Sequence, residues 1–118
     1  VRGEDGMDEL SVCGLTRIVH AEPGRGVREA ETTPEAVGLK RRVLMELAGG
    51  DAAHNAGILE AVLGGRPGAA LDAVLFNAGG ALLAAGLAET LKDGLDKARE
   101  SVASGAAKAA LDGARRAR

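Results

Sequence analysis

The side chains best suited to chemistry are two adjacent carboxylates, Asp8 and Glu9, within the first ten residues. Two glycines and two further acidic residues surround them, so we expect residues 1–10 to form a loop. Adjacent carboxylates in a loop offer several hard oxygen ligands to Mg²⁺, which prefers oxygen and keeps waters and substrate phosphates among its ligands. A solvated acidic turn has the same composition, so the pair by itself leaves both interpretations open.

The other reactive side chains form no arrangement that supports catalysis, and no catalytic residue is assigned. The single cysteine, Cys13, lacks an evident base and cannot form an internal disulfide. His20 and His54 have no second His or Cys at a metal-ligand spacing, which argues against zinc. Asn55 and Asn77 interrupt apolar helical stretches. We expect each to be a buried amide that ties neighbouring backbone together.

The elements that must position these residues begin with strands. Two partly β-branched runs, residues 15–21 and 27–32, are joined by Pro23-Gly24-Arg25-Gly26. This pattern predicts a β-hairpin. Thr33-Pro34-Glu35 then places a capping residue before a proline, which predicts a short helix that Gly38 closes.

Helical periodicity begins after Gly49. Asp51 is a suitable N-cap for a first long helix, whose apolar residues share one stripe and which ends before the glycine-rich residues 64–68. The segment from about residue 69 to residue 85 is apolar on nearly every face, so we expect it to be buried. Its central pair, Gly79-Gly80, is expected to admit close backbone packing.

A third helix is predicted to start at Thr90, where Asp93 completes a motif like a capping box. Its residues Leu91, Leu95, Ala98 and Val102 are expected to face inward. Gly105 separates it from a final Ala-rich segment. From the residues alone, the fold is therefore a loop and a hairpin followed by three or four packed helices, of the α/β or α+β class.

Composition limits the classes of protein that fit. A chain of 118 residues suits one domain. Phe76 is its single aromatic residue and 18 residues are glycine, so the core is thin and marginal stability is expected. A formal net charge of −2 argues against nucleic acid as a partner, and no apolar run approaches a membrane span of roughly 20 residues.

Location and completeness can also be predicted. A lone cysteine fits the reducing cytoplasm, and the N-terminus has no signal-peptide pattern. The chain starts at Val1 without an initiator Met, directly before a glycine- and acid-rich turn. We therefore expect it to be truncated upstream.

Five segments, in their order along the chain, resemble the C-terminal portion of the anthranilate phosphoribosyltransferases. Residues 3–10 resemble the family's HGxDGLDE segment, and residues 33–39 resemble its TPE-x-x-GL turn. Residues 49–63 are similar to GGDAxxNAxxLxAVL, and residues 72–78 to DAVLLNAA. The helix from Thr90 to Gly105 ends in the family's ARE-x-x-x-SG-A pattern.

The resemblance implies a function and a fold. The family transfers the phosphoribosyl group of phosphoribosyl pyrophosphate to anthranilate, with release of pyrophosphate, in tryptophan biosynthesis. Asp8 and Glu9 match its acidic pair, which implies that they bind the Mg²⁺ ions that hold the pyrophosphate, with Glu9 contacting both metals and Asp8 one. Residues 1–118 would form the C-terminal part of an α/β domain, with a few sheet strands and the final helices.

The resemblance also implies what this chain lacks. The family's GTGGD phosphate loop, its KHGN segment, its anthranilate-binding arginine and its N-terminal helical domain all precede the matching region. The rest of the enzyme would thus be the partner of this chain, and the isolated chain is expected to be inactive.

Arg2 stands where the family usually has His. Two alternatives remain: a non-catalytic paralogue or regulatory domain that retains the scaffold, and a related enzyme similar to the nucleoside phosphorylases.

Overall fold

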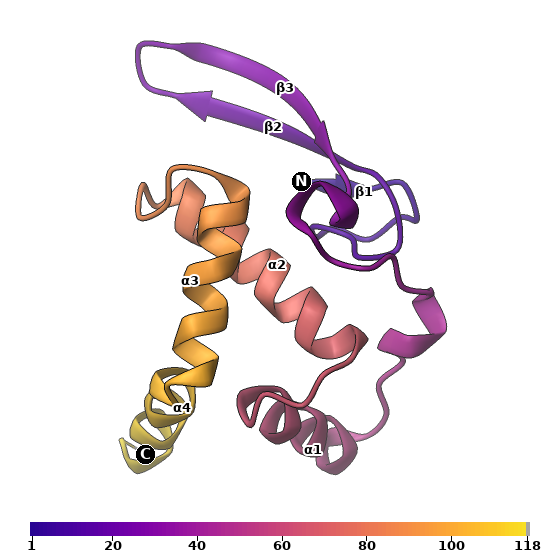
Figure 1. The fold of residues 1–118 in the computed structure, drawn as a ribbon, viewed down its shortest axis with the longest axis vertical. Helices are drawn as coiled ribbons and strands as arrows, with labels where there is room; N and C mark the ends of the chain where they lie inside the picture. Colours follow the sequence, from indigo (N-terminus) through magenta and orange to yellow (C-terminus); the bar gives the residue numbers. More distant parts are fainter. Residues whose placement is uncertain (118) are drawn as a thin grey trace.

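A small antiparallel sheet and four α-helices form the fold of the computed structural model, which describes residues 1–117 (Figure 1). The elements are β1 (Arg2–Gly3), β2 (Thr16–Glu22), β3 (Gly26–Thr32), two 3₁₀ turns η1 (Pro34–Val37) and η2 (Leu44–Leu47), α1 (Ala52–Leu63), α2 (Ala69–Ala84), α3 (Leu91–Ala103) and α4 (Ala106–Arg116). The predicted α/β class, with a hairpin ahead of three or four helices, is confirmed, and the helices of residues 1–117 number four. η2 had no counterpart in the sequence prediction.

The predicted hairpin is formed by β2 and β3, which pair antiparallel with Thr16 opposite Thr32 and Glu22 opposite Gly26. Gly24 and Gly26 adopt φ values of 75° and 77° at the turn, a region that favours glycine because it has no Cβ. The hairpin projects away from the helices (Figure 1), and almost all of β3 is exposed. Its far end therefore contributes little to the core.

The prediction of a loop over residues 1–10 is wrong at its start. Arg2 and Gly3 form β1, which pairs with β2 so that Arg2 lies opposite Arg17 and Gly3 opposite Thr16. Two residues are too few to show the alternation by which a strand is recognised. β1 exists because β2 supplies backbone partners, which no local pattern reveals.

The closest helix contact joins α2 to α3. A Cβ added at Gly79 would lie 2.6 Å from the Leu95 nitrogen and 3.0 Å from the Gly94 carbonyl carbon. The predicted close packing at Gly79 is thus confirmed, and Gly94 is the partner glycine that the sequence did not reveal. Phe76 and Leu95, both 0% exposed, flank this contact.

The core lies where α2 and α3 meet the segments on either side of the hairpin. Its buried members are Leu10, Val12, Val37, Leu39, Leu75, Phe76, Leu95 and Ala98. The prediction that α2 is buried on every face is wrong in part, since Val74 is 42% exposed and Ala81 and Ala84 are exposed. Only α3 and the segments beside the hairpin cover α2 extensively, so one of its apolar faces stays open.

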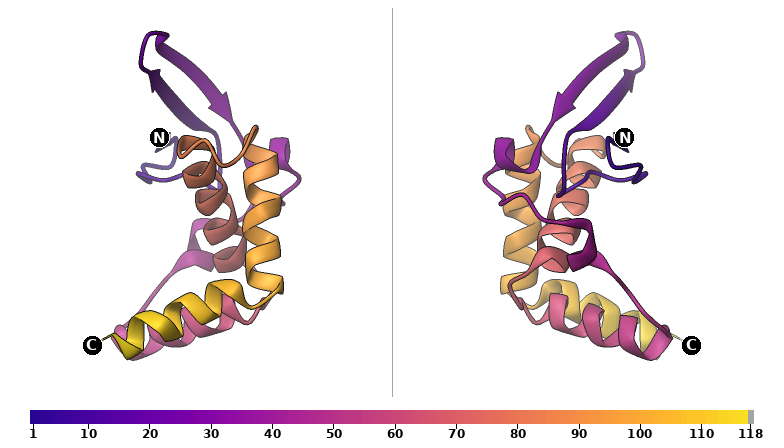
Figure 2. Two further views of the ribbon diagram at one scale, coloured as in Figure 1. Left: turned by 90° about the vertical axis from the view of Figure 1, so that its left-hand side faces the viewer. Right: turned by 90° about the vertical axis from the view of Figure 1, so that its right-hand side faces the viewer.

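α1 and α4 run side by side at the end of the molecule away from the hairpin (Figure 2). Glu60 of α1 accepts hydrogen bonds from Lys108 Nζ at 3.1 Å and forms an ion pair with Arg115 Nη1 at 2.7 Å. The apolar stripe of α1 buries only Val62, while Leu59 is 42% exposed. Ion pairs between α1 and α4 therefore supplement a small apolar contact.

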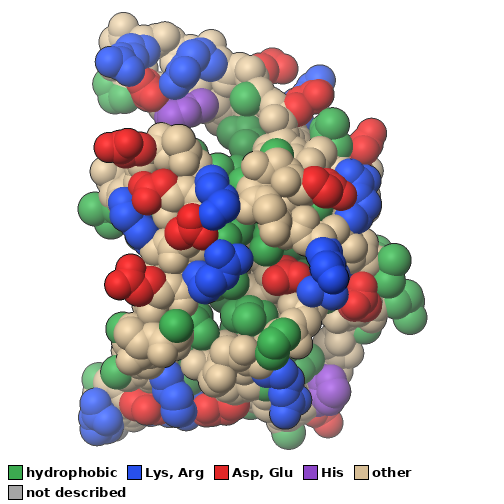
Figure 3. Space-filling model, in the orientation of Figure 1, with side chains coloured by type: hydrophobic (Ala, Val, Ile, Leu, Met, Phe, Trp, Pro, Cys, Tyr) green, Lys and Arg blue, Asp and Glu red, His purple; other side chains and the backbone are tan. Residues whose placement is uncertain are grey.

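Charges of both signs are interspersed over the face seen in Figure 3. No single-sign stripe appears there, in keeping with the formal net charge of −2. Among the helices of residues 1–117, none combines the length and the apolar character needed to cross a membrane.

Candidate functional site

The candidate site is the acidic loop, residues 3–10, which runs from the end of β1 to the buried Leu10. Asp8 and Glu9 are both exposed and directly precede Leu10. Within residues 1–117, neither carboxylate takes part in a hydrogen bond or an ion pair. Both side chains are thus available to a ligand in solvent.

The first half of the acidic loop is held by Asp5. Its Oδ1 accepts a hydrogen bond from Met7 N at 3.1 Å, and its Oδ2 accepts one from Ser11 Oγ at 2.5 Å. The Gly3 N–H donates to the Met7 carbonyl at 2.7 Å and closes the turn. The Asp5 carboxylate is thus engaged with the protein and belongs to the scaffold of the loop.

The second half is held by Asn77 of α2. Its Oδ1 accepts a hydrogen bond from Leu10 N at 2.8 Å, while its Nδ2 donates to the carbonyl oxygens of Leu10 and Ala73, each at 3.0 Å. The prediction that this amide ties neighbouring backbone together is confirmed. Leu10 follows Glu9 directly, so the bonds fix the chain at the acidic pair.

Residues just after the acidic loop add further anchors. Ser11 N donates to Thr16 Oγ1 at 2.9 Å, and both residues are 0% exposed. Arg42 donates its backbone N–H to the Val12 carbonyl at 2.8 Å, while its Nε donates to Asp72 Oδ2 at 2.8 Å. The chain from Leu10 to Val12 is therefore bonded to α2, to β2 and to the segment after η1.

Arg2, where the resemblance leads us to expect His, lies beside this loop. It is exposed on β1, opposite Arg17. A hollow of about 320 Å³ there is lined by Arg2, Gly3, Glu4, Gly6, Leu15, Arg17 and Glu31. The replacement thus keeps a polar, hydrogen-bonding side chain and adds a permanent positive charge next to the acidic loop.

The acidic pair fits Mg²⁺ as half of a site. Across residues 1–117, no group of three or more His, Cys, Asp or Glu side chains is arranged to hold a metal. A cage made entirely of protein ligands is therefore absent from the described residues. Mg²⁺ is commonly held by only one or two carboxylates together with substrate phosphates, and Asp8 and Glu9 would be the two carboxylates of such a site.

Cys13 lies in the segment between the acidic loop and β2. It is partly buried, and its backbone N–H donates to Ser11 Oγ at 2.9 Å. Burial raises the pKa of the Cys13 thiol, and the nearby Asp5 carboxylate raises it further. A raised pKa lowers the fraction of thiolate, which is the nucleophilic form.

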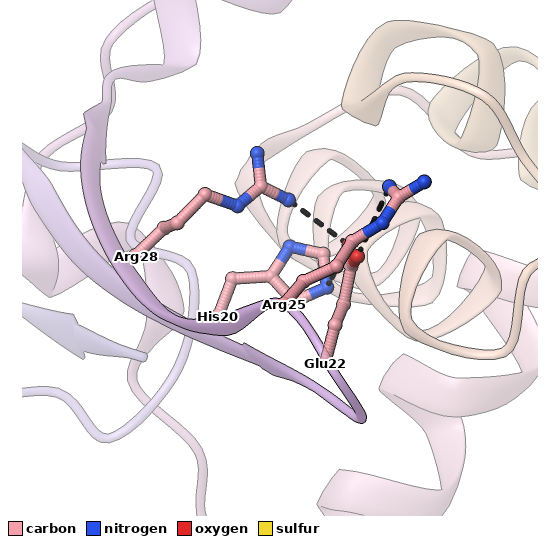
Figure 4. A network of polar contacts seen from close by, with 4 residues as sticks. All are labelled: His20, Glu22, Arg25 and Arg28. Carbon is pink, nitrogen blue, oxygen red and sulfur yellow. Dashed lines mark hydrogen bonds and ion pairs between the residues drawn. The ribbon is translucent and has the colours of Figure 1, made fainter.

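His20 belongs to a network at the end of the hairpin (Figure 4). Glu22 accepts hydrogen bonds from Arg28 at 2.9 Å and Arg25 at 3.3 Å, and it lies 3.3 Å from His20 Nε2. The arginine side chains are more than 60% exposed. Exposed pairs contribute about 0–1 kcal/mol each, so this network strengthens the hairpin modestly and contains no metal-ligand arrangement.

The other two candidates lie at the start of α1. The exposed His54 donates its backbone N–H to the N-cap Asp51 at 2.8 Å, which confirms that cap. Asn55 accepts from Gly50 N at 2.9 Å and donates to Gly50 O at 3.0 Å. It ties backbone together as predicted, but the expectation that it is buried is wrong because α1 has solvent on that side.

Proteins of known structure have a similar fold. The anthranilate phosphoribosyltransferase of Thermus thermophilus matches with a TM-score of 0.77 at 39% identity, over 92% of this chain and 32% of that one. The Saccharomyces cerevisiae enzyme in complex with PRPP and Mg matches with a TM-score of 0.85 at 30% identity, over 94% of this chain and 32% of that one.

Curated relatives carry the same name. The anthranilate phosphoribosyltransferase of Azorhizobium caulinodans is 52% identical over 112 residues, which are 95% of this chain and 32% of that protein. The one from Desulfatibacillum aliphaticivorans is 47% identical, over 95% of this chain and 33% of that protein. The chain thus spans about a third of the length of these relatives.

The family model described as "Glycosyl transferase family, a/b domain" matches residues 1–108. This match covers the acidic loop, the sheet and the helices through α3, and the resemblance in five ordered motifs agrees with it. The chain therefore belongs to the glycosyl transferase family, within its α/β domain, and is similar to the anthranilate phosphoribosyltransferases.

Proposed function

We propose that this chain is the part of an anthranilate phosphoribosyltransferase that presents Asp8 and Glu9 to Mg²⁺. The whole enzyme would transfer the phosphoribosyl group of phosphoribosyl pyrophosphate to anthranilate, and residues 1–118 would be part of its α/β domain. One observation carries the proposal: two exposed carboxylates, without a hydrogen-bond or ion-pair partner among residues 1–117, lie on a loop whose flanks are bonded to the rest of the fold. The 52% identity to the Azorhizobium caulinodans enzyme supports it.

In the proposed reaction, the anthranilate nitrogen forms a bond to C1 of the ribose while the bond from C1 to the pyrophosphate oxygen breaks. The nitrogen releases one proton, and pyrophosphate leaves with the bonding electron pair. Mg²⁺, when bound, supplies positive charge that stabilises the leaving group. Asp8 and Glu9 hold that charge in place, and the scaffold of the acidic loop keeps them oriented without reorganisation during the reaction.

The rest of the enzyme is the partner that we propose for this chain, since two thirds of the length of the relatives lies outside the match. Alone, the chain is proposed to be inactive because no catalytic base or anthranilate site has been assigned to it. We place the enzyme in the cytoplasm, which a partly buried single cysteine supports.

A chimera tests the activity. The matching third of the Azorhizobium caulinodans enzyme is replaced by this chain, and consumption of anthranilate is followed in the presence of phosphoribosyl pyrophosphate and Mg²⁺. We expect an active chimera that loses at least about a hundredfold in rate on Asp8→Ala/Glu9→Ala substitution, since the charge on the leaving group is then less stabilised. Glu4→Ala, which removes another exposed acid of the same loop, is the matched control.

The outcomes separate the alternatives. A folded but inactive chimera would favour a non-catalytic paralogue. A chimera that accepts phosphate and a nucleoside instead would favour an enzyme similar to the nucleoside phosphorylases. An active chimera that is insensitive to Asp8→Ala/Glu9→Ala would show that this pair is not the metal site.

A further inference from the structure

Among residues 1–117, Asn77 is the one helix side chain that bonds directly to the backbone of the acidic loop. It lies 67 positions from Leu10 in the sequence, yet it engages both the N–H and the carbonyl oxygen of that residue. Its second N–H donates to Ala73 O, one helical turn earlier on α2. The bond to Ala73 O therefore fixes the orientation of the amide on α2, and its other two bonds hold the Leu10 backbone.

The Leu10 side chain is held as firmly as its backbone. It is 3% exposed, and its Cδ1 lies 2.6 Å from the position that a Cβ on Gly80 would occupy. Gly80 thus leaves room for Leu10 against α2. Because the Leu10 nitrogen belongs to the peptide group that follows Glu9, fixing that nitrogen also fixes the direction in which the chain leaves Glu9.

The acidic pair itself makes no such contacts with the protein. The Asp8 and Glu9 side chains have no partner within residues 1–117, and the hold on the other side, by Asp5, reaches only Met7 and Ser11. Asn77 is therefore the link between the acidic pair and the α2–α3 core. Removing it leaves Leu10 held by its side chain alone.

We propose that Asn77 is a positioning residue for the acidic pair, and that its amide sets where Asp8 and Glu9 stand relative to α2. The inference rests on the proposed function for the role of the pair in metal binding. An amide is required because the three hydrogen bonds, to Leu10 N, Leu10 O and Ala73 O, need one acceptor and two donors on the same planar group. Asp would keep the acceptor but lose both donors, and Leu would keep the approximate volume and lose all three bonds.

The test compares Asn77→Leu with wild type in the isolated chain, with Mg²⁺ and inorganic pyrophosphate as probes. ¹⁵N relaxation gives the order of the Asp8 and Glu9 amides without metal, and amide shifts give the half-saturating Mg²⁺ concentration. We expect the order parameters to fall from about 0.85 to below about 0.6. Loss of a group that orients metal ligands typically weakens metal binding about 10- to 100-fold. Asn77 acts on the pair through the backbone, so we expect the lower end, a rise of about tenfold in the half-saturating concentration.

Asn55→Leu is the matched control, because Asn55 makes the same paired bonds to a single residue, Gly50, away from the acidic loop. It should change neither readout. Asn77→Asp is a milder variant that removes only the donors, and it reports the same loss if Asn77→Leu does not fold. Folding is judged from the amide shift of Leu95 in the α2–α3 core.

Unchanged order at Asp8 and Glu9 in a folded Asn77 variant would overturn the proposal. So would lost order combined with Mg²⁺ binding as tight as in wild type. If the wild-type chain shows no response to Mg²⁺ and pyrophosphate while the order still falls in the variants, Asn77 positions the loop and the metal role proposed for this chain fails instead.

Discussion

Replacement of Gly79 by alanine is expected to destabilise the protein, although alanine is the better helix former. The change alone favours the helix by about 1 kcal/mol. The new Cβ, however, would lie 2.6 Å from Leu95 N and 3.0 Å from the Gly94 carbonyl carbon. Both are backbone atoms of α3 and cannot rotate away, so the helices must separate.

Separation of α2 from α3 would loosen the best-packed part of the core, since Phe76 and Leu95 are both 0% exposed. Overpacking of a core costs about 1–3 kcal/mol, and occasionally more. We expect the upper end of that range because backbone meets backbone. After the gain in helix propensity is subtracted, the free energy of unfolding should fall by about 2 kcal/mol.

Urea denaturation followed by circular dichroism at 222 nm measures this loss. Gly57→Ala is the matched control: Gly57 lies inside α1, and a Cβ there would meet nothing within 4 Å. It should stabilise the protein by about 0.5–1 kcal/mol through the helix preference. If Gly79→Ala proves as stable as wild type or more so, the close approach of α2 to α3 does not limit the packing and the reasoning is refuted.

Two further substitutions test a cap and an ion pair. Thr90→Ala removes the hydroxyl that accepts from Asp93 N at 3.0 Å, so unfolding free energy should fall by about 1 kcal/mol in the same assay, while Thr90→Ser should stay near wild type. For Glu35, the hydrogen bond from Arg41 lowers the pKa from its ordinary 4.5 to about 2. The ionised Glu35 therefore stabilises the folded state fully above pH 4.5, and this contribution is lost as the pH falls toward 2. Glu35→Gln should thus flatten the dependence of the free energy of unfolding on pH over that interval. An NMR titration midpoint near 4.5 for Glu35 would contradict this.

Much of the fold follows from signals within a few residues. The turn at residues 23–26, the caps at Asp51 and Thr90, and the left-handed Gly38 after η1 each depend on local backbone preferences and short hydrogen bonds. For that reason the order of the elements could be predicted from the sequence. The acidic pair could be predicted as well, because two adjacent carboxylates are visible without any structure.

The contacts of the acidic loop could be predicted only in part from the local sequence. The sequence singles out the adjacent Asp8 and Glu9 but does not show which acid of the loop is bonded to the protein. The structure engages Asp5 with Ser11, whereas Asp8 and Glu9 have no hydrogen-bond or ion-pair partner within residues 1–117. A short-range bond from Met7 N to Asp5 is a known turn pattern and could have suggested this role. The bond to Ser11 could not, since it depends on how the chain folds back.

The sequence by itself determined the hairpin, the short turn after it and the long helices, where several of them start and stop, and that an acidic loop precedes the hairpin. The tertiary structure decided that Arg2–Gly3 become a strand, which face of α2 stays open, that Gly94 is the partner of Gly79, and that Asn77 holds Leu10. Each of these depends on the approach of backbone segments that lie far apart in the chain. Periodicity and capping act over about four residues, so they carry no information on such contacts.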